Sequence, residues 1–243
     1  GIIGPIPQEE FSMESIQKKI DANPFIKNKK RKPRILTLTQ STYDGVSYNV
    51  ETLKNMLDGK IDYLHFDEAW LPHAAFHDFY KDMHAIGKDR PRTKDSIIFS
   101  TQSTHKMLAG LSQASQILVS ESENKKLNRH VFNEAYLMHT STSPQYSIIA
   151  SCDVAAAMME GPGGPALVEE SISEAMDFRR SMRKVEMEWG SDWWVKVWGP
   201  DEICEEGIGS RENWILKPND KWHGFGSLQA NFNMLDPIRA TVV

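Results

Sequence analysis

Two β-branched runs on either side of one amphipathic segment constrain the fold of this chain most. Residues 35–39 read Ile-Leu-Thr-Leu-Thr and predict a strand, and residues 61–66 predict a second one. Between them, Asn49 can cap a helix whose apolar residues share one face. Strand, turn, helix and strand in this order predict a βαβ unit and therefore a parallel sheet. Ligands bind beyond the carboxyl ends of such strands, where Asp44 and Asp67 fall.

The remaining pattern extends this α/β architecture. Residues 96–101 and 117–119 predict two more strands, and residues 12–20, 132–139, 146–159 and 167–189 predict helices, the first capped by Ser12. Residues 161–165 are rich in Gly and Pro and predict a linker. We expect a mostly parallel sheet flanked by helices. The core stripe of the long helix would comprise Ile172, Ala175, Phe178, Met182, Val185 and Trp189.

Composition excludes several classes of partner. The 243 residues carry a net charge of -5, which argues against a nucleic-acid partner because phosphate binding needs a basic excess. The basic run at residues 27–34 is interpreted as a solvated loop, with a nucleic-acid or targeting patch as the alternative. No run of about 18 apolar residues predicts a membrane span. Cys152 and Cys204 form no cluster, which suits a reducing cytoplasm.

An amine and a carboxylate follow two of the predicted strands. Lys106 lies in the run Ser103-Thr104-His105-Lys106, and Asp67 closes the strand at residues 61–66. A lysine can form a Schiff base with pyridoxal phosphate (PLP), and an aspartate can pair with its pyridine nitrogen. Ser103 and Thr104 offer hydroxyls for a phosphate. The alternatives without a catalytic role are a lysine at the surface and an aspartate that caps a helix or forms a salt bridge.

A metal site is the rival interpretation. His73 and His77 are spaced i, i+4 and could share a metal on one helix face with His65 and Asp67 nearby, as in a metal-dependent hydrolase. No Glu follows His73 as an H-E-x-x-H motif requires, and no cysteine lies near. We therefore predict no metal.

Several motifs in a fixed order resemble the bacterial inducible ornithine/lysine/arginine decarboxylases of PLP fold type I. They are residues 41–45, 65–70, 103–106, 132–136 leading to 139–144, and 222–225. The resemblance covers nearly the whole chain and implies an aminotransferase-like large domain.

The resemblance also implies roles by position. Lys106 would be the Schiff-base lysine and Asp67 the partner of the pyridine nitrogen. Ala69 would pack on the ring and Trp70 would border the site. Ser103 and His105 would contact the phosphate and the lysine side of the cofactor, and Ser141 would reach the phosphate of a neighbouring subunit's cofactor. His105 or Lys106 would return a proton to the substrate.

The implied activity is decarboxylation of lysine, arginine or ornithine, by a homodimer or a larger assembly of dimers. Many family members consume a proton per turnover and serve acid resistance. Their products, a diamine or agmatine, belong to polyamine metabolism. The substrate is not readable from these residues. A non-catalytic fragment or degenerate homologue that serves oligomerisation is the alternative.

The ends of the sequence predict a piece of a longer protein. It opens without Met and stops inside the apolar run that ends at Val243. We expect residues 1–160 to form the later part of a PLP-binding large domain. Residues 161–190 would be a linker and a long connecting helix, and residues 191–243 the start of a smaller α+β domain.

Overall fold

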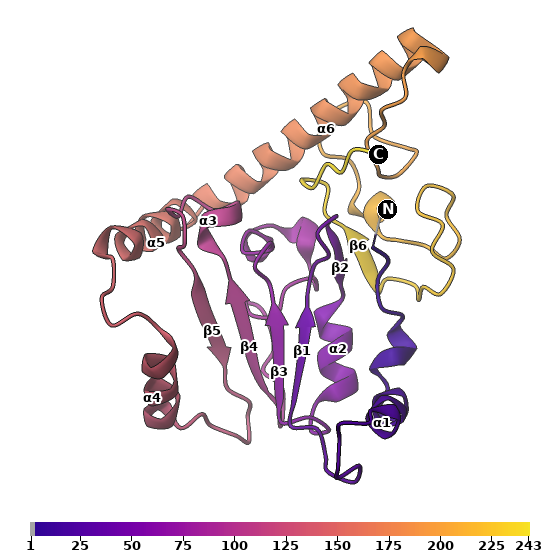
Figure 1. Ribbon diagram of the computed structural model, residues 1–243. Coiled ribbons are helices and arrows are strands. Elements are labelled where there is room, and N and C mark those ends of the chain that lie inside the picture. Colours follow the sequence, from indigo (N-terminus) through magenta and orange to yellow (C-terminus); the bar gives the residue numbers. More distant parts are fainter. Residues whose placement is uncertain (1–2) are drawn as a thin grey trace.

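The computed structural model describes residues 3–243 (Figure 1). The N-terminal segment forms a 3-10 turn, η1 (Gln8–Phe11), followed by helix α1 (Met13–Ala22). The Ser12 hydroxyl accepts a hydrogen bond from the Ser15 amide, which confirms the predicted cap. Within residues 3–243, every helix is too short or too polar to cross a membrane.

Four strands form the central sheet in the order β1-β3-β4-β5. Strands β1 (Ile35–Thr39), β3 (Tyr63–Asp67) and β4 (Ile97–Gln102) are parallel, and their arrows point the same way in Figure 1, whereas β5 (Gln116–Ser120) runs antiparallel to β4. The connection to β5 contains only the one-turn helix α3 (Thr104–Met107), and antiparallel neighbours need no longer crossover. The predicted mostly parallel α/β fold is confirmed.

The two faces of this sheet differ. Helix α2 (Val50–Leu57) starts at Asn49, whose side chain accepts a hydrogen bond from the Thr52 amide, as predicted. It packs on one face in a buried cluster that includes Leu53, Leu57, Leu64, Phe66 and Ile98. Side chains alternate along a strand, so the residues between these point to the other face. There Ile35 is 57% exposed and Ile117 is 44% exposed. The second face is therefore exposed at its two edge strands, whereas Phe99 of β4 stacks on Phe132 with ring centroids 6.0 Å apart.

Helix α6 (Gly163–Trp189) runs diagonally past the carboxyl ends of the parallel strands in Figure 1. It begins before Leu167, where the sequence predicted its start, so the predicted linker at 161–165 is partly helical. The predicted apolar stripe is right only in its first half. Ile172 is buried, but Phe178 is 42% exposed and Trp189 is 58% exposed, because the second half of α6 extends beyond the core.

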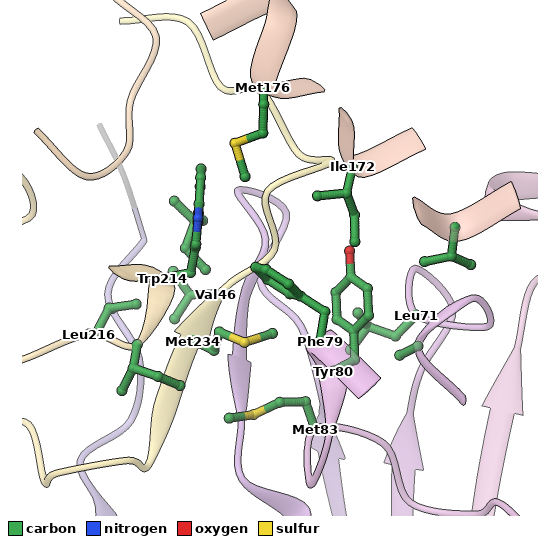
Figure 2. Close-up of a cluster of buried hydrophobic side chains, with 14 of the residues drawn as sticks. Val46, Leu71, Phe79, Tyr80, Met83, Ile172, Met176, Trp214, Leu216 and Met234 are labelled. Carbon is green, nitrogen blue, oxygen red and sulfur yellow. The ribbon is translucent and has the colours of Figure 1, made fainter. Parts of the chain in front are cut away.

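A second core joins α6 to distant parts of the chain. Strands β2 (Val46–Tyr48) and β6 (Asn233–Leu235) pair antiparallel. Figure 2 shows Ile172 and Met176 of α6 pointing towards Phe79, Tyr80 and Trp214. Residues after Gly190 thus return to pack beside β2. The domain boundaries at residues 160 and 190 stay predictions.

Short turns and two further helices complete the chain. The segment after Trp70 forms two 3-10 turns, whereas the metal interpretation required His73 and His77 to share one helix. Residues beyond α6 form two more such turns. These elements are η2 (Ala74–Phe76), η3 (Asp78–Tyr80), α4 (Arg129–His139), α5 (Tyr146–Met158), η4 (Gly190–Asp192) and η5 (Arg211–Trp214). The helices α4 and α5 lie close to their predicted positions.

Candidate functional site

The predicted lysine and aspartate follow neighbouring strands. Asp67 is the last residue of β3 and stands opposite Thr101 of β4 in the parallel register. Lys106 lies in α3, which Figure 1 shows just beyond the end of β4. Both residues are partly exposed. An amine and a carboxylate therefore lie at the same edge of the sheet.

Asp67 shapes the turn that follows it. Its Oδ1 accepts a hydrogen bond from the Ala69 amide at 3.1 Å, a local bond that aspartate commonly makes at a strand end. This turn carries the chain to Trp70. The next residue, Glu68, points the other way and is fully buried. Its carboxylate accepts hydrogen bonds from Ser100 Oγ at 2.5 Å, Gln102 Nε2 at 3.0 Å and the Ala85 amide at 2.6 Å. Glu68 thereby ties the end of β3 to β4.

His65 lies two residues before Asp67 on the same face of β3. Its Nε2 is 3.1 Å from Thr101 Oγ1, and its Nδ1 is 3.4 Å from Thr37 Oγ1. Burial lowers the pKa of His65 from its ordinary value, and the nearby charge of Asp67 opposes that shift. His65 therefore bridges the three parallel strands and is best suited to holding the sheet beside the site.

Lys106 sits above an aromatic ring. Its Nζ is 4.5 Å from the centre of the Trp70 ring, within the range of a cation–π contact. Its backbone amide donates to Ser103 O at 3.1 Å. The Ser103 side chain makes no capping hydrogen bond at the start of α3, and within residues 3–243 its hydroxyl is available to another partner. The tight turn at 103–106 thus presents a hydroxyl and an amine.

His105 is held by the loop that leads to β5. Its Nδ1 lies 2.8 Å from Ala114 O, and because a carbonyl only accepts, Nδ1 carries the proton. Nε2 of the neutral ring is then the acceptor. This tautomer leaves the outer ring nitrogen available to exchange a proton.

Ser141 is not brought to these residues. It is exposed in the loop between α4 and α5, where its Oγ accepts a hydrogen bond from the Ser143 amide. In residues 3–243, no hydrogen bond joins Ser141 to the turn that carries Lys106. A role for Ser141 in the site therefore requires a neighbouring molecule.

The two histidines of the rival metal interpretation lie apart and contact different partners. His73 is buried beside Asp236, with 3.3 Å between Nε2 and Oδ2, whereas His77 bonds Glu169 of α6 at 2.6 Å. They lie before two separate 3-10 turns, so the i, i+4 spacing does not place them on one helix face. Within the described part of the chain, no group of three or more His, Cys, Asp or Glu side chains could hold a metal ion.

Arg239 is a neighbour of the site that the sequence did not reveal. Its Cζ lies 4.2 Å from the centre of the Trp70 ring and 5.5 Å from that of Tyr43. The two rings meet edge to face, with centroids 5.6 Å apart. The one signal in the sequence was an arginine inside the apolar run at the end of the chain. Its partners, about 170 and 196 positions away, could not be inferred from spacing.

Comparison with known proteins gives a consistent picture. The family model described as "Orn/Lys/Arg decarboxylase, major domain" matches residues 1–243. The chain is 46% identical to lysine decarboxylase LdcA of Pseudomonas aeruginosa over 243 residues, which is all of this chain and 32% of that protein. It is 39% identical over 261 residues to the biodegradative arginine decarboxylase of Escherichia coli, again over the whole chain and 34% of that protein.

A solved structure supports the same relationship. Lysine decarboxylase A from Pseudomonas aeruginosa superposes with a TM-score of 0.90 at 47% sequence identity, over 100% of this chain and 32% of that chain. The chain spans about a third of the length of the relatives it matches.

Proposed function

Because the chain belongs to the Orn/Lys/Arg decarboxylase family, we propose that it carries part of a PLP-dependent site that decarboxylates a basic amino acid. The substrate would be lysine, arginine or ornithine, and the products the corresponding amine and carbon dioxide. The observation that carries the proposal is the placement of Lys106 and Asp67 at one edge of neighbouring parallel strands, with Trp70 beneath the lysine.

The residues present fit the cofactor by their chemistry. An amine, a half-exposed carboxylate and the uncommitted Ser103 hydroxyl are the groups that an aldehyde, a pyridine nitrogen and a phosphate require. Asp67 and His65 are two positions apart on β3 and therefore point to the same face of the sheet. When bound, PLP withdraws the electrons left at the substrate's α-carbon as carbon dioxide departs.

The proposal assigns a role to each residue. Lys106 would hold the cofactor through its amine. Asp67 would pair with the pyridine nitrogen and keep it protonated. Ala69 would pack on the ring, Trp70 would border it, and Ser103 would contact the phosphate. His105, whose Nδ1 is engaged by Ala114 O, or Lys106 would return a proton to the α-carbon.

We also propose that the site is completed by a second copy of the protein. Ser141 lies on an exposed loop between α4 and α5, and it would contact the phosphate in the neighbouring subunit.

We further propose that the protein acts in the cytoplasm. Its two cysteines, Cys152 and Cys204, are free thiols, as suits a reducing compartment. A reaction that takes up a proton and releases an amine there suits acid resistance and polyamine supply.

Replacement of the lysine tests the proposal. In the holoprotein, Lys106→Ala should abolish the visible absorbance of lysine-bound cofactor and reduce carbon dioxide release to background, because it removes the amine proposed to attach the cofactor. Carbon dioxide release is measured separately with lysine, arginine and ornithine, which also identifies the substrate. Lys60→Ala, a change on the exposed turn after α2, is the matched control and should alter neither readout.

Two outcomes would contradict the proposal. Visible absorbance that survives in Lys106→Ala would mean that another residue holds the cofactor. Absence of both absorbance and carbon dioxide release in the unaltered protein would favour the non-catalytic role in oligomerisation.

A further inference from the structure

Within the described residues, the Arg239 side chain has a buried N–H donor, at Nη1, without a hydrogen-bond acceptor. Its Nη2 donates to the Tyr43 carbonyl, but its Nη1 is buried and has no hydrogen-bond partner in residues 3–243. A buried donor without an acceptor costs about 1–3 kcal/mol, and more when it is charged. The geometry therefore points to an acceptor that binds from outside the chain.

The surroundings of Nη1 favour an anion. Arg239 and Lys106 both stack on Trp70, with 4.2 Å from Cζ and 4.5 Å from Nζ to the ring centre. Neither forms an ion pair within the described residues. Both cations contact the same ring, and an anion would supply Nη1 of Arg239 with a charge-assisted hydrogen bond.

The nearby carboxylates are already engaged. Asp44 Oδ1 accepts a hydrogen bond from Thr241 Oγ1 at 3.1 Å. Asp236 Oδ1 accepts from Tyr80 Oη at 2.7 Å and from the Ile238 amide at 3.0 Å, and its Oδ2 lies beside His73. These carboxylates influence Arg239 through space without bonding to it. A ligand anion would therefore be its direct partner.

The backbone of Arg239 is fixed in advance. Its amide donates to Asp236 O at 3.1 Å, and its carbonyl accepts a hydrogen bond from Arg179 Nη2 of α6 at 3.0 Å. Arg179 itself is only 2% exposed. A side chain on such a fixed backbone loses little freedom when it binds a ligand, which is the condition for a selective contact.

We infer that Nη1 of Arg239 binds the α-carboxylate of the substrate. This inference rests on the proposed function, since it requires a basic amino acid at Lys106. Such a substrate has an anion at one end and a cation at the other. The guanidinium of Arg239 would attract the carboxylate and repel the distal cation, which orients the substrate with its carboxylate towards Arg239. Arg239 would thus be a specificity-determining residue.

The kinetic consequence separates binding from chemistry. Arg239 contacts the group that departs as neutral carbon dioxide, so the contact is strongest before the reaction and weakens as the bond breaks. Its removal should raise KM without lowering kcat. A charge-assisted hydrogen bond of about 1.5–3 kcal/mol corresponds to a rise of roughly 10- to 150-fold.

The test compares ligands with and without a carboxylate in the holoprotein. For Arg239→Gln we expect KM for the amino acid to rise roughly 10- to 150-fold, with kcat unchanged or raised. The binding constant of the matching decarboxylated amine, measured by calorimetry, should stay within about twofold because that ligand lacks the anion. Arg239→Lys keeps the charge but not the planar fork, so it should give an intermediate KM.

Controls separate the other outcomes. Arg34→Gln removes an arginine whose ion pair with Asp62 lies at the opposite end of the sheet, and it should leave KM unchanged. Cofactor lost on dialysis of Arg239→Gln would show that the anion is the cofactor phosphate and would overturn the inference. An unchanged KM in a folded, cofactor-loaded variant would overturn it as well. Failure of the proposed function can be told from failure of the Arg239 inference, because in the former case the unaltered protein would release no carbon dioxide.

Discussion

At the scale of single residues, the buried Glu68 carboxylate couples the site to pH. Burial raises the pKa of Glu68 above its usual value, although Ser100, Gln102 and the Ala85 amide donate to it. The folded protein therefore holds this proton more tightly than the unfolded chain does. Stability should fall as pH rises from the usual pKa of about 4.3 through the raised value.

Substitution of Glu68 checks this sign. Glu68→Gln should remove that part of the pH dependence and change the free energy of unfolding by less than about 1 kcal/mol at low pH, since an amide can still bond these groups. Glu68→Ala leaves three donors without an acceptor and should cost on the order of 3 kcal/mol. Denaturant unfolding at a series of pH values measures both. An equal pH dependence in Glu68→Gln and the unaltered protein would contradict the assignment.

Residues at strand ends were predictable where the chemistry was local. Lys106 and Asp67 each follow an apolar run, so their common edge could be predicted from strand order alone. Arg239 could not, because its position depends on β2–β6 pairing across most of the chain. Glu68 lay within a recognised motif, but its burial depends on hydrogen-bond donors from β4 and from the Ala85 loop.

At the scale of elements, helix α6 is anchored through Arg179. Its Nη1 donates to Pro237 O at 2.6 Å and its Nη2 to Arg239 O, while its Cζ lies 5.0 Å from the Trp214 ring centre. Burial lowers the pKa of Arg179 to about 10, and the charge of Asp236 opposes this shift. The guanidinium thus stays charged at neutral pH and holds the segment after β6 to the helix.

Arg179→Met should release this segment. We expect a loss of on the order of 3 kcal/mol in the free energy of unfolding, because buried carbonyls lose charged donors and Asp236 loses a nearby cation. Hydrogen exchange at the Ile238 and Arg239 amides should accelerate more than in the strands of the central sheet. Lys184→Met, an exposed change on the same helix, is the control. Similar effects of both substitutions would contradict an anchoring role.

The periodic pattern of α6 shows what a sequence can and cannot predict for an element. A helix was predicted correctly from spacing, because the period of 3.6 depends only on the helix itself. Which residues are buried depends on where the neighbouring elements end, and the core ends before Phe178. In the same way, the spacing of His73 and His77 suggested one helix, whereas the intervening 3-10 turn places them against different partners.

At the scale of the whole molecule, α4 and α5 each expose large apolar side chains. They are Val131, Tyr136, Leu137 and Met138 of α4, and Tyr146, Ile149, Val154 and Met158 of α5. Helix α4 has no buried residue, and Ala155 is the buried residue of α5. A helix as apolar as α5 is normally covered, and exposed apolar surfaces of this kind mark interfaces. Because Ser141 lies in the loop that joins the two helices, we expect a second copy that covers them to contact this loop.

Introduction of a charge tests this arrangement. Met138 is 79% exposed, so Met138→Glu should leave the fold intact while placing a carboxylate in the proposed interface, where an unpaired charge is costly. We expect sedimentation to show a shift towards monomer and the cofactor to be retained less well, since Ser141 could no longer reach the neighbouring site. Met187→Glu is the matched control, because Met187 is 77% exposed but lies on the projecting end of α6. An unchanged mass for Met138→Glu would place the subunit contact elsewhere. A monomer that kept its cofactor would separate assembly from the role proposed for Ser141.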